Sequence, residues 1–198
     1  MARPQAANYD ERKEKILRTA AKVFADEGYH KASVNTIAAQ CDMSKSLIYH
    51  YFSSKQDILY HSMIDHVKEL DKLAQEVLAD TLPAEKKLKR IIRRYLKIYQ
   101  DTVAEHHLLI NELSNLSAGQ KEEVVSIQNS VVQVFADLAH DLSPAPLEAH
   151  KGKTVVSMLM LGMMNWTYIW FKPGGPMTSD DLADMIANIF LNGLKGLK

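Results

Sequence analysis

The sequence contains little of what folds outside the all-helical class depend on. One cysteine in 198 residues leaves no partner for an intrachain disulfide, so a disulfide-stapled secreted domain is excluded. Six prolines and eight glycines leave long stretches without a helix breaker, and the alternation of β-branched residues that is typical of strands is absent. These absences predict an all-α protein.

Signals for export or membrane insertion are also absent. The first residues, MARPQAANYDERK, lack the apolar core of a secretory signal. No apolar run reaches the roughly 20 residues that a membrane-spanning helix needs. The single cysteine, Cys41, suits a reducing compartment and is best explained as a small packed residue. We therefore expect a cytoplasmic protein with no membrane partner.

The chain has no net charge, with 24 Lys and Arg against 24 Asp and Glu, which excludes a general nucleic-acid coating protein. The charge is nevertheless uneven along the chain. Residues 1–55 hold 9 Lys and Arg against 6 Asp and Glu, whereas residues 56–198 hold 15 against 18. A mildly basic first part on a mildly acidic second part fits a protein in which only the first part touches DNA.

Residues 33–55 have the pattern of a helix-turn-helix. Two short segments with helical apolar spacing, 34–40 and 44–49, are separated by only three residues, too few for anything but a tight corner. Ser33 and Ser44 are each placed to cap the helix that follows. Asp42, in the corner, tolerates the left-handed backbone conformation that such a corner needs.

The second of these helices carries hydrogen-bond donors on its polar side. They are Lys45, Ser46, Tyr49, His50 and Tyr51, followed by Lys55. Leu47, Ile48 and Phe52 are apolar and can hold the helix on a core. Such a helix can read base edges and bind phosphates in a major groove. An ordinary helical hairpin with a solvated polar face would have the same spacing, so both interpretations stay open at this point.

This segment resembles the N-terminal signature of the TetR family of bacterial transcriptional regulators. The matching positions are Ile37-Ala38, Cys41 to Lys45, Leu47 to Phe52, Ser54-Lys55 and Ile58-Leu59. Cys41, Asp42, Met43 and Ile58 depart mildly from the family pattern, and Asp42 adds a negative charge near the DNA. The resemblance implies a three-helix DNA-binding domain in residues 1–54 and a helical effector-binding and dimerisation domain in residues 55–198.

On this hypothesis we assign contacts within the DNA-binding part. Lys45 and Ser46 would read bases. The residues expected to hold phosphates are Ser33, Ser44, Tyr49, His50, Tyr51 and Lys55. Residues 1–8, with Arg3, would be a polar tail that is either disordered or able to reach the DNA backbone or minor groove.

Apolar periodicity and capping residues predict helices over the rest of the chain as well. A helix opened by Asn8 and Glu11 runs to about Glu27, where Gly28 stops it. Ser53 and Ser54 are placed to cap a long helix that ends before Thr81. The resemblance implies that this helix connects the DNA-binding part to the effector cavity. The later helices are expected at 83–105, around 106–116, at 121–142, from the loop at 143–146 to about 171, and from 179 onward.

The helix expected at 83–105 has a basic remainder beside its apolar face, formed by Lys86, Lys87, Lys89, Arg90, Arg93, Arg94 and Lys97. A solvated face explains it, and so does a dock for the phosphates of an effector such as a coenzyme A thioester. A membrane-surface helix is a weaker third option, because no Trp or Phe accompanies the charge.

The C-terminal third is rich in Met and aromatic residues, which can line an adaptable apolar cavity or form a plain hydrophobic core. Residues 162–194 resemble, more narrowly, TetR-family members that respond to acyl-coenzyme A. The expected effector-binding residues are Tyr95, Tyr99, Asn111, Met163, Asn165, Trp166 and Trp170. The last two helices present more apolar surface than one chain covers, and in the resemblance they form the homodimer interface.

These observations predict a homodimeric, ligand-responsive repressor that binds a palindromic operator and is released by a small apolar or acyl-coenzyme A effector. No metal or cofactor is expected, because His106 and His107 point apart on a helix and no His-x3-His pair exists. A helical small-molecule or lipid carrier without DNA binding is the alternative. An enzyme ranks third, since no Gly-rich phosphate loop or nucleophile arrangement stands out.

Overall fold

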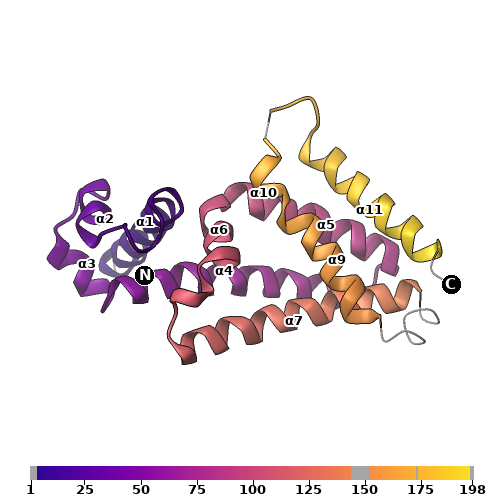
Figure 1. Ribbon diagram of the computed structural model, residues 1–198, viewed down its shortest axis with the longest axis horizontal. Coiled ribbons are helices and arrows are strands. Elements are labelled where there is room, and N and C mark those ends of the chain that lie inside the picture. Colours follow the sequence, from indigo (N-terminus) through magenta and orange to yellow (C-terminus); the bar gives the residue numbers. More distant parts are fainter. Residues whose placement is uncertain (1–3, 144–151, 173, 197–198) are drawn as a thin grey trace. The chain divides into compact units, whose positions relative to one another are not determined.

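Local sequence signals start and stop the helices. The structure, a computed structural model, describes residues 4–143, 152–172 and 174–196, and these are helical without a strand. They form two compact units, residues 1–67 with 102–124, and residues 68–101 with 125–198. Helices α4 (Lys55–Leu78) and α7 (Ala118–Leu142) contribute to both (Figure 1). The all-α prediction is confirmed, while the predicted functional boundary at residue 54 stays a prediction.

Three helices form the start of the first unit: α1 (Pro4–Glu27), α2 (Val34–Gln40) and α3 (Lys45–Tyr51). Their core contains Ile16, Phe24, Ile37 and Ile48, all fully buried. Gly28 follows α1 with a φ of 80°, the left-handed stop expected there.

Helix α1 begins earlier than predicted. Asn8 and Glu11 have the spacing of a capping box, but the helix already starts at Pro4. Proline is well suited to a first helical turn, because its φ is preset and its missing N–H would have no partner there. The helix therefore gains a turn that the capping pattern did not indicate.

The rest of the first unit is made of the N-terminal part of α4, of α6 (Val103–Asn111) and of the short 3-10 helix η1 (Leu113–Asn115). Helix α6 packs against α1. The Gln56 side chain donates to the carbonyl of Asn115 at 2.7 Å, and the Tyr60 hydroxyl donates to Glu123 at 2.6 Å. Ser54 accepts a bond from the Asp57 N–H at 3.0 Å, as expected for the start of α4.

The boundary predicted near Glu105, between the helix expected at 83–105 and the next one, lies too far along the chain. Helix α5 (Ala84–Asp101) ends at Asp101, and α6 begins at Val103. Thr102 between them is not helical, with φ −131° and ψ 45°. Apolar spacing alone could not reveal the break, because it falls where the chain passes from the second unit to the first, and each helix buries its apolar face in its own unit.

The second unit contains α5, α9 (Lys153–Asn165), α10 (Thr167–Trp170) and α11 (Ser179–Gly196), besides the parts of α4 and α7 already described. Tyr95 and Phe135 meet edge to face in its core, 5.4 Å between ring centroids. Helix α11 packs along α5. The predicted helix ending at Phe171 is two helices, α9 and the single turn α10. The loop residues 144–146 lie outside the described residues.

Candidate functional site

The helix-turn-helix corner is built as the sequence indicates. Ser33 Oγ accepts a hydrogen bond from the N–H of Thr36, and Ser44 Oγ accepts one from Leu47, each at 3.1 Å. Asp42 adopts a φ of 55°, so the corner contains the left-handed residue that the spacing requires. Both capping predictions and the corner prediction are confirmed.

Helix α3 buries one side and exposes the other. Ile48 lies on the buried side and is fully inaccessible, and Phe52 caps the end of the helix in the core. Four side chains with hydrogen-bonding groups are exposed along the rest of α3: Lys45, Ser46, Tyr49 and His50. Tyr51 is half-buried. The exposed groups offer hydroxyl, ammonium and imidazole donors on one short helix, which is the chemistry that base edges and phosphates accept.

Two residues of the predicted DNA-contact set have polar partners besides a helix cap. Lys55 Nζ donates to the carbonyls of Tyr29 and Ala32 at 2.7 and 2.9 Å and lies 4.4 Å from the centre of the Tyr29 ring. Ser33 Oγ lies 2.9 Å from the Thr36 hydroxyl in addition to its capping bond. Lys55 therefore ties the start of α4 to the loop after α1.

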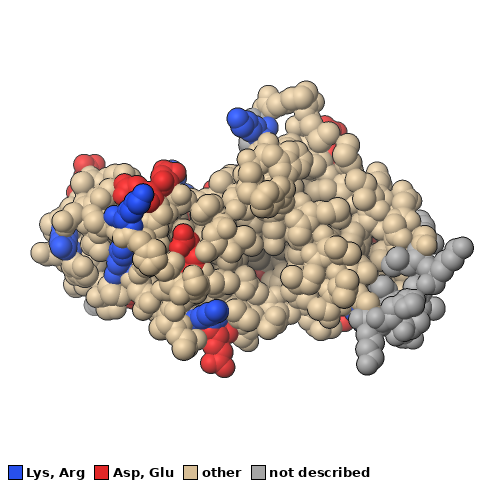
Figure 2. Space-filling model, viewed as in Figure 1, with Lys and Arg blue, Asp and Glu red and all other residues tan. Residues whose placement is uncertain are grey.

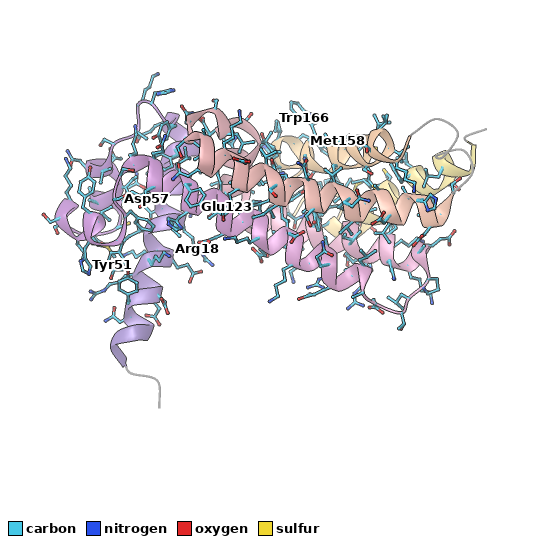
Figure 3. The ribbon with its side chains drawn as sticks, turned by 90° about the horizontal axis from the view of Figure 1, so that it is seen from below. Arg18, Tyr51, Asp57, Glu123, Met158 and Trp166 are labelled. Atoms are coloured by element: carbon cyan, nitrogen blue, oxygen red, sulfur yellow. The ribbon has the colours of Figure 1, made fainter. Side chains whose placement is uncertain are left out.

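Tyr9 is a residue beside α3 that sequence reasoning missed. The ring of Tyr9 on α1 lies 4.6 Å from that of Tyr51 on α3, centroid to centroid, with an interplanar angle of 32°. Tyr51 is labelled in Figure 3, where it lies beside α1. The available signal was the seven-residue spacing between Tyr9 and Ile16, which puts both on one face of a helix.

A buried histidine pair lies within the first unit. His66 Nε2 on α4 lies 3.2 Å from His106 Nδ1 on α6, and both side chains are buried. Burial lowers the pKa of His66 from its ordinary value to about 4. His66 is therefore neutral at physiological pH, and its ring makes a buried hydrogen bond to His106 that joins two helices. Sequence reasoning weighed His106 only as a metal ligand, with His107.

The three arginines of the basic remainder of α5 form ion pairs. Arg93 reaches Asp180 and Asp184 of α11 at 2.9 and 3.0 Å. Arg94 pairs with Glu76 at 3.4 Å, Arg90 pairs with Asp80, and Lys87 donates to a backbone carbonyl. These partners were invisible in the sequence because they lie on α4, on α11 and in the loop that follows α4. They favour a solvated, paired face over a phosphate dock.

The predicted effector residues separate into groups. The Tyr99 hydroxyl donates to Asn165 Oδ1 at 2.8 Å, and the Tyr95 hydroxyl donates to the carbonyl of Leu70 at 2.8 Å. Burial raises the pKa of both tyrosines, so both hydroxyls stay protonated. Asn111 lies in the first unit and donates to the carbonyl of His107. Tyr95, Tyr99 and Asn165 thus lie together in the second unit, whereas Asn111 lies in the first unit.

The remaining effector candidates lie on a surface. Trp166 is 62% exposed, Trp170 51% and Met163 36%. They belong to a row of exposed apolar residues at helical spacing along α9 and α10, which we call the apolar stripe: Val155, Met158, Leu159, Met163, Trp166, Ile169 and Trp170. Met158 and Trp166 mark it in Figure 3. Met185 and Ile189 are exposed on α11.

Figure 2 shows one face of the molecule, on which Lys and Arg are visible over α1–α3, mixed with Asp and Glu.

Within the part of the chain that the structure describes, no group of three His, Cys, Asp or Glu residues is placed to hold a metal ion. None of the helices in residues 4–143, 152–172 and 174–196 combines the length and apolar character needed to cross a membrane.

A capped helix, a left-handed corner and a second helix that exposes hydrogen-bond donors define a helix-turn-helix DNA-binding protein. The family model "Bacterial regulatory proteins, tetR family" matches residues 16–61. The model "Tetracyclin repressor-like, C-terminal domain" matches residues 81–194, more than half of the chain. The chain belongs to the TetR family of bacterial transcriptional regulators, which confirms the resemblance.

Three known proteins illustrate the similarity. The HTH-type transcriptional activator FasR of Mycolicibacterium smegmatis is 24% identical, over 93% of this chain and 84% of FasR. A TetR-family regulator from Bordetella parapertussis 12822 superposes with a TM-score of 0.87 at 31% identity, covering 94% of this chain and 97% of that one. The structure of AibR in complex with isovaleryl coenzyme A and operator DNA superposes with a TM-score of 0.78 at 25% identity. The match covers 90% of this chain and 97% of the AibR chain.

Proposed function

We propose that this protein is a cytoplasmic, ligand-responsive transcriptional repressor that binds a palindromic operator as a homodimer. The observation that carries the proposal is the face of α3: four exposed hydrogen-bonding side chains on a helix fixed to the core by Ile48. Repression, rather than activation, is supported by the repressor-like family model over residues 81–194. FasR, a relative, is an activator, so the direction needs its own test.

The proposed DNA contacts follow from exposure and from existing partners. Lys45 and Ser46, near the start of α3, read bases in the major groove. Ser44, Tyr49, His50 and Tyr51 bind phosphates on either side. We leave out Lys55, whose ammonium donates to backbone carbonyls, and Ser33, whose hydroxyl meets the Thr36 hydroxyl besides its capping bond. Ser44 Oγ accepts a capping bond from Leu47, and its hydroxyl hydrogen can still be donated to a phosphate.

The homodimer is proposed to form through the apolar stripe of α9 and α10, with Met185 and Ile189 of α11. Contiguous exposed apolar area of this kind marks an interaction surface, and a second copy offers the same apolar chemistry. Two α3 helices held about 34 Å apart would enter successive major grooves of a palindromic site.

The proposed effector is an acyl-coenzyme A thioester. AibR, which this chain resembles over 90% of its length, is solved with isovaleryl coenzyme A. In this chain the Tyr99–Asn165 hydrogen bond places two polar groups within an interior that also holds Met160 and Met164. Polar groups in a Met-rich apolar interior can orient a ligand. An effector that prefers the conformation with low DNA affinity would weaken DNA binding. A coupling free energy of roughly 1–3 kcal/mol between the two ligands would change DNA affinity about 5- to 150-fold.

A mobility-shift titration tests the proposal. The purified protein is titrated on the intergenic DNA beside its own gene at two salt concentrations, with and without isovaleryl or a long-chain acyl-coenzyme A, and free coenzyme A as control. Specific binding that weakens steeply with salt and is relieved by the thioester alone supports the proposal.

The other outcomes correct it in defined ways. Specific binding that is indifferent to every thioester discards the effector class and keeps the DNA-binding regulator. Absence of specific binding there and in a selection from genomic fragments overturns the operator and favours the helical lipid carrier. A reporter gene behind the bound fragment decides the direction, because deleting a repressor raises expression and deleting an activator lowers it.

A further inference from the structure

The contact between Tyr9 and Tyr51 joins residues 42 positions apart in the chain. One ring comes from the N-terminal part of α1 and the other from the C-terminal end of α3. Their centroids are 4.6 Å apart, within the range of favourable aromatic pairs. Tyr9 is 43% exposed, so the pair lies at the surface beside the face of α3 that is proposed to meet DNA.

The backbone of Tyr9 is held well away from the fraying end of a helix. Because α1 starts at Pro4, Tyr9 lies in the second turn rather than in the first position. Ile16, two turns further on the same face, is fully buried. Lys15 Nζ also donates to the carbonyl of Cys41 at 2.9 Å, which fastens α1 to the helix-turn-helix corner. Tyr9 is therefore presented from a helix that is anchored to the core and to the corner about two turns further on.

Tyr51 lies at the end of its own helix, where its ring meets that of the neighbouring His50 edge to face, 5.6 Å between centroids. It is the last residue of α3, and its side chain is only half-buried. An aromatic side chain at such a position would sample several rotamers, and a DNA contact would have to bear the cost of ordering it. The tilted contact with the ring of Tyr9 selects one arrangement of the Tyr51 side chain before DNA arrives.

We propose that Tyr9 is a positioning residue for operator binding: its ring holds Tyr51 so that the Tyr51 hydroxyl meets a phosphate without prior ordering. This inference rests on the proposed DNA contact of Tyr51. It assigns to the start of α1 a part in DNA binding that requires no contact between Tyr9 and the DNA.

The test is a double-mutant cycle on the fragment bound by the wild type. Tyr9→Ala and Tyr9→Phe are made in the wild-type and Tyr51→Phe backgrounds, with Asn8→Ala as the matched control on the same turn. Tyr9→Phe keeps the ring and binds like the wild type. Tyr9→Ala loses about 3- to 10-fold in affinity. In the Tyr51→Phe background, which lacks the hydroxyl, Tyr9→Ala has little further effect.

The salt dependence supplies a second readout. A neutral hydroxyl displaces no counterion, so Tyr9→Ala leaves the slope of log affinity against log salt unchanged. If Tyr9→Ala lost the same affinity in both backgrounds, Tyr9 would act independently of Tyr51. If Tyr9→Phe lost affinity, the Tyr9 hydroxyl itself would bind DNA. Either outcome overturns the proposal, and so does a Tyr9→Ala variant that binds DNA as tightly as the wild type.

Folding and the broader function are controlled separately. Thermal unfolding of each variant shows whether α1 remains in place, and Tyr9→Leu, which keeps an apolar side chain, replaces Tyr9→Ala if that variant does not fold. If the wild type binds no DNA specifically, the operator function fails and this inference fails with it. If the wild type binds and Tyr9→Ala binds equally well, only this inference fails.

Discussion

Asp42 occupies the one described position, other than glycine, with a positive φ. Glycine adopts this conformation without the steric penalty of a Cβ, so Asp42→Gly should raise the free energy of unfolding by about 1 kcal/mol. Asp42→Asn keeps a side chain that tolerates the left-handed region and removes only the charge. We expect it to leave stability near the wild-type value. Urea unfolding of both variants measures this, and a destabilised Asp42→Gly would contradict it.

Lys45 and Tyr49 separate base reading from phosphate binding. Tyr49→Ala should weaken binding to operator and non-operator DNA alike, by about 1 kcal/mol, because a phosphate contact carries no sequence information. Lys45→Ala should reduce the preference for the operator by about 1–3 kcal/mol. Competitive fluorescence-anisotropy titrations on both DNAs measure the two effects. Wild-type affinity in both variants would refute the assignment.

Substitution of Lys55 tests whether this cation binds DNA or stabilises the fold. Lys55→Met removes the ammonium that serves the carbonyls of Tyr29 and Ala32, so we expect the free energy of unfolding to fall by about 1–3 kcal/mol. The exposed Lys31→Met is the control and should change stability little. If Lys55→Met kept its stability and only flattened the salt dependence of DNA binding, the phosphate contact predicted from the sequence would be right after all.

At the scale of elements, the packing of α6 on α4 depends on a neutral His66. Burial holds the folded-state pKa of His66 at about 4, below the ordinary 6.5. As pH falls through 6.5, His66 of the unfolded chain takes up a proton, whereas His66 of the native chain stays neutral until about pH 4. The free energy of unfolding should therefore be full at neutral pH and fall by up to about 3 kcal/mol between these values.

Urea unfolding at a series of pH values measures this slope. His66→Asn removes the titrating group, so its free energy of unfolding should vary less over the same interval. His30→Asn, at an exposed position, is the control and should keep the wild-type slope. An unchanged slope in His66→Asn would assign the pH dependence to other groups.

At the scale of the whole molecule, the apolar stripe decides the assembly. Leu159 is 63% exposed in the single chain, and a charge there would be buried without a partner in a dimer. Leu159→Glu should therefore shift the protein to monomers, measured by sedimentation velocity, and abolish operator binding at concentrations where the wild type binds. Asn129→Glu, on α7, is exposed and should leave the assembly unchanged. A dimeric Leu159→Glu would place the interface elsewhere.

The assembly also bears on the predicted effector residues. Trp166 and Trp170 were expected to line a cavity, and in the single chain they lie on the apolar stripe instead. Tyr99 and Asn165, by contrast, meet inside the second unit. Composition indicated that Met and aromatic residues gather in the C-terminal third, but not which of them face inward, because that depends on the helices packed against them.

Local chemistry determined the helix-turn-helix without help from distant residues. Ser33 and Ser44 cap their own helices, Asp42 turns its own corner, and Gly28 stops α1, all through groups within four residues. The break at Thr102 separates two consecutive helices that belong to different units, and the two ion pairs of Arg93 join helices far apart in the chain. No short pattern predicts either feature.

By itself, the sequence determined the all-helical class, the family and the exposed face of α3, since each follows from caps, periodicity and a short motif. Only the tertiary structure decided that Lys55 serves backbone carbonyls, that His66 pairs with His106, and that Tyr9 lies against Tyr51. The physical reason is the distance along the chain over which each interaction acts. Capping and helical periodicity act over a few residues, whereas these contacts require segments 23 to 42 residues apart in the chain to be packed together first.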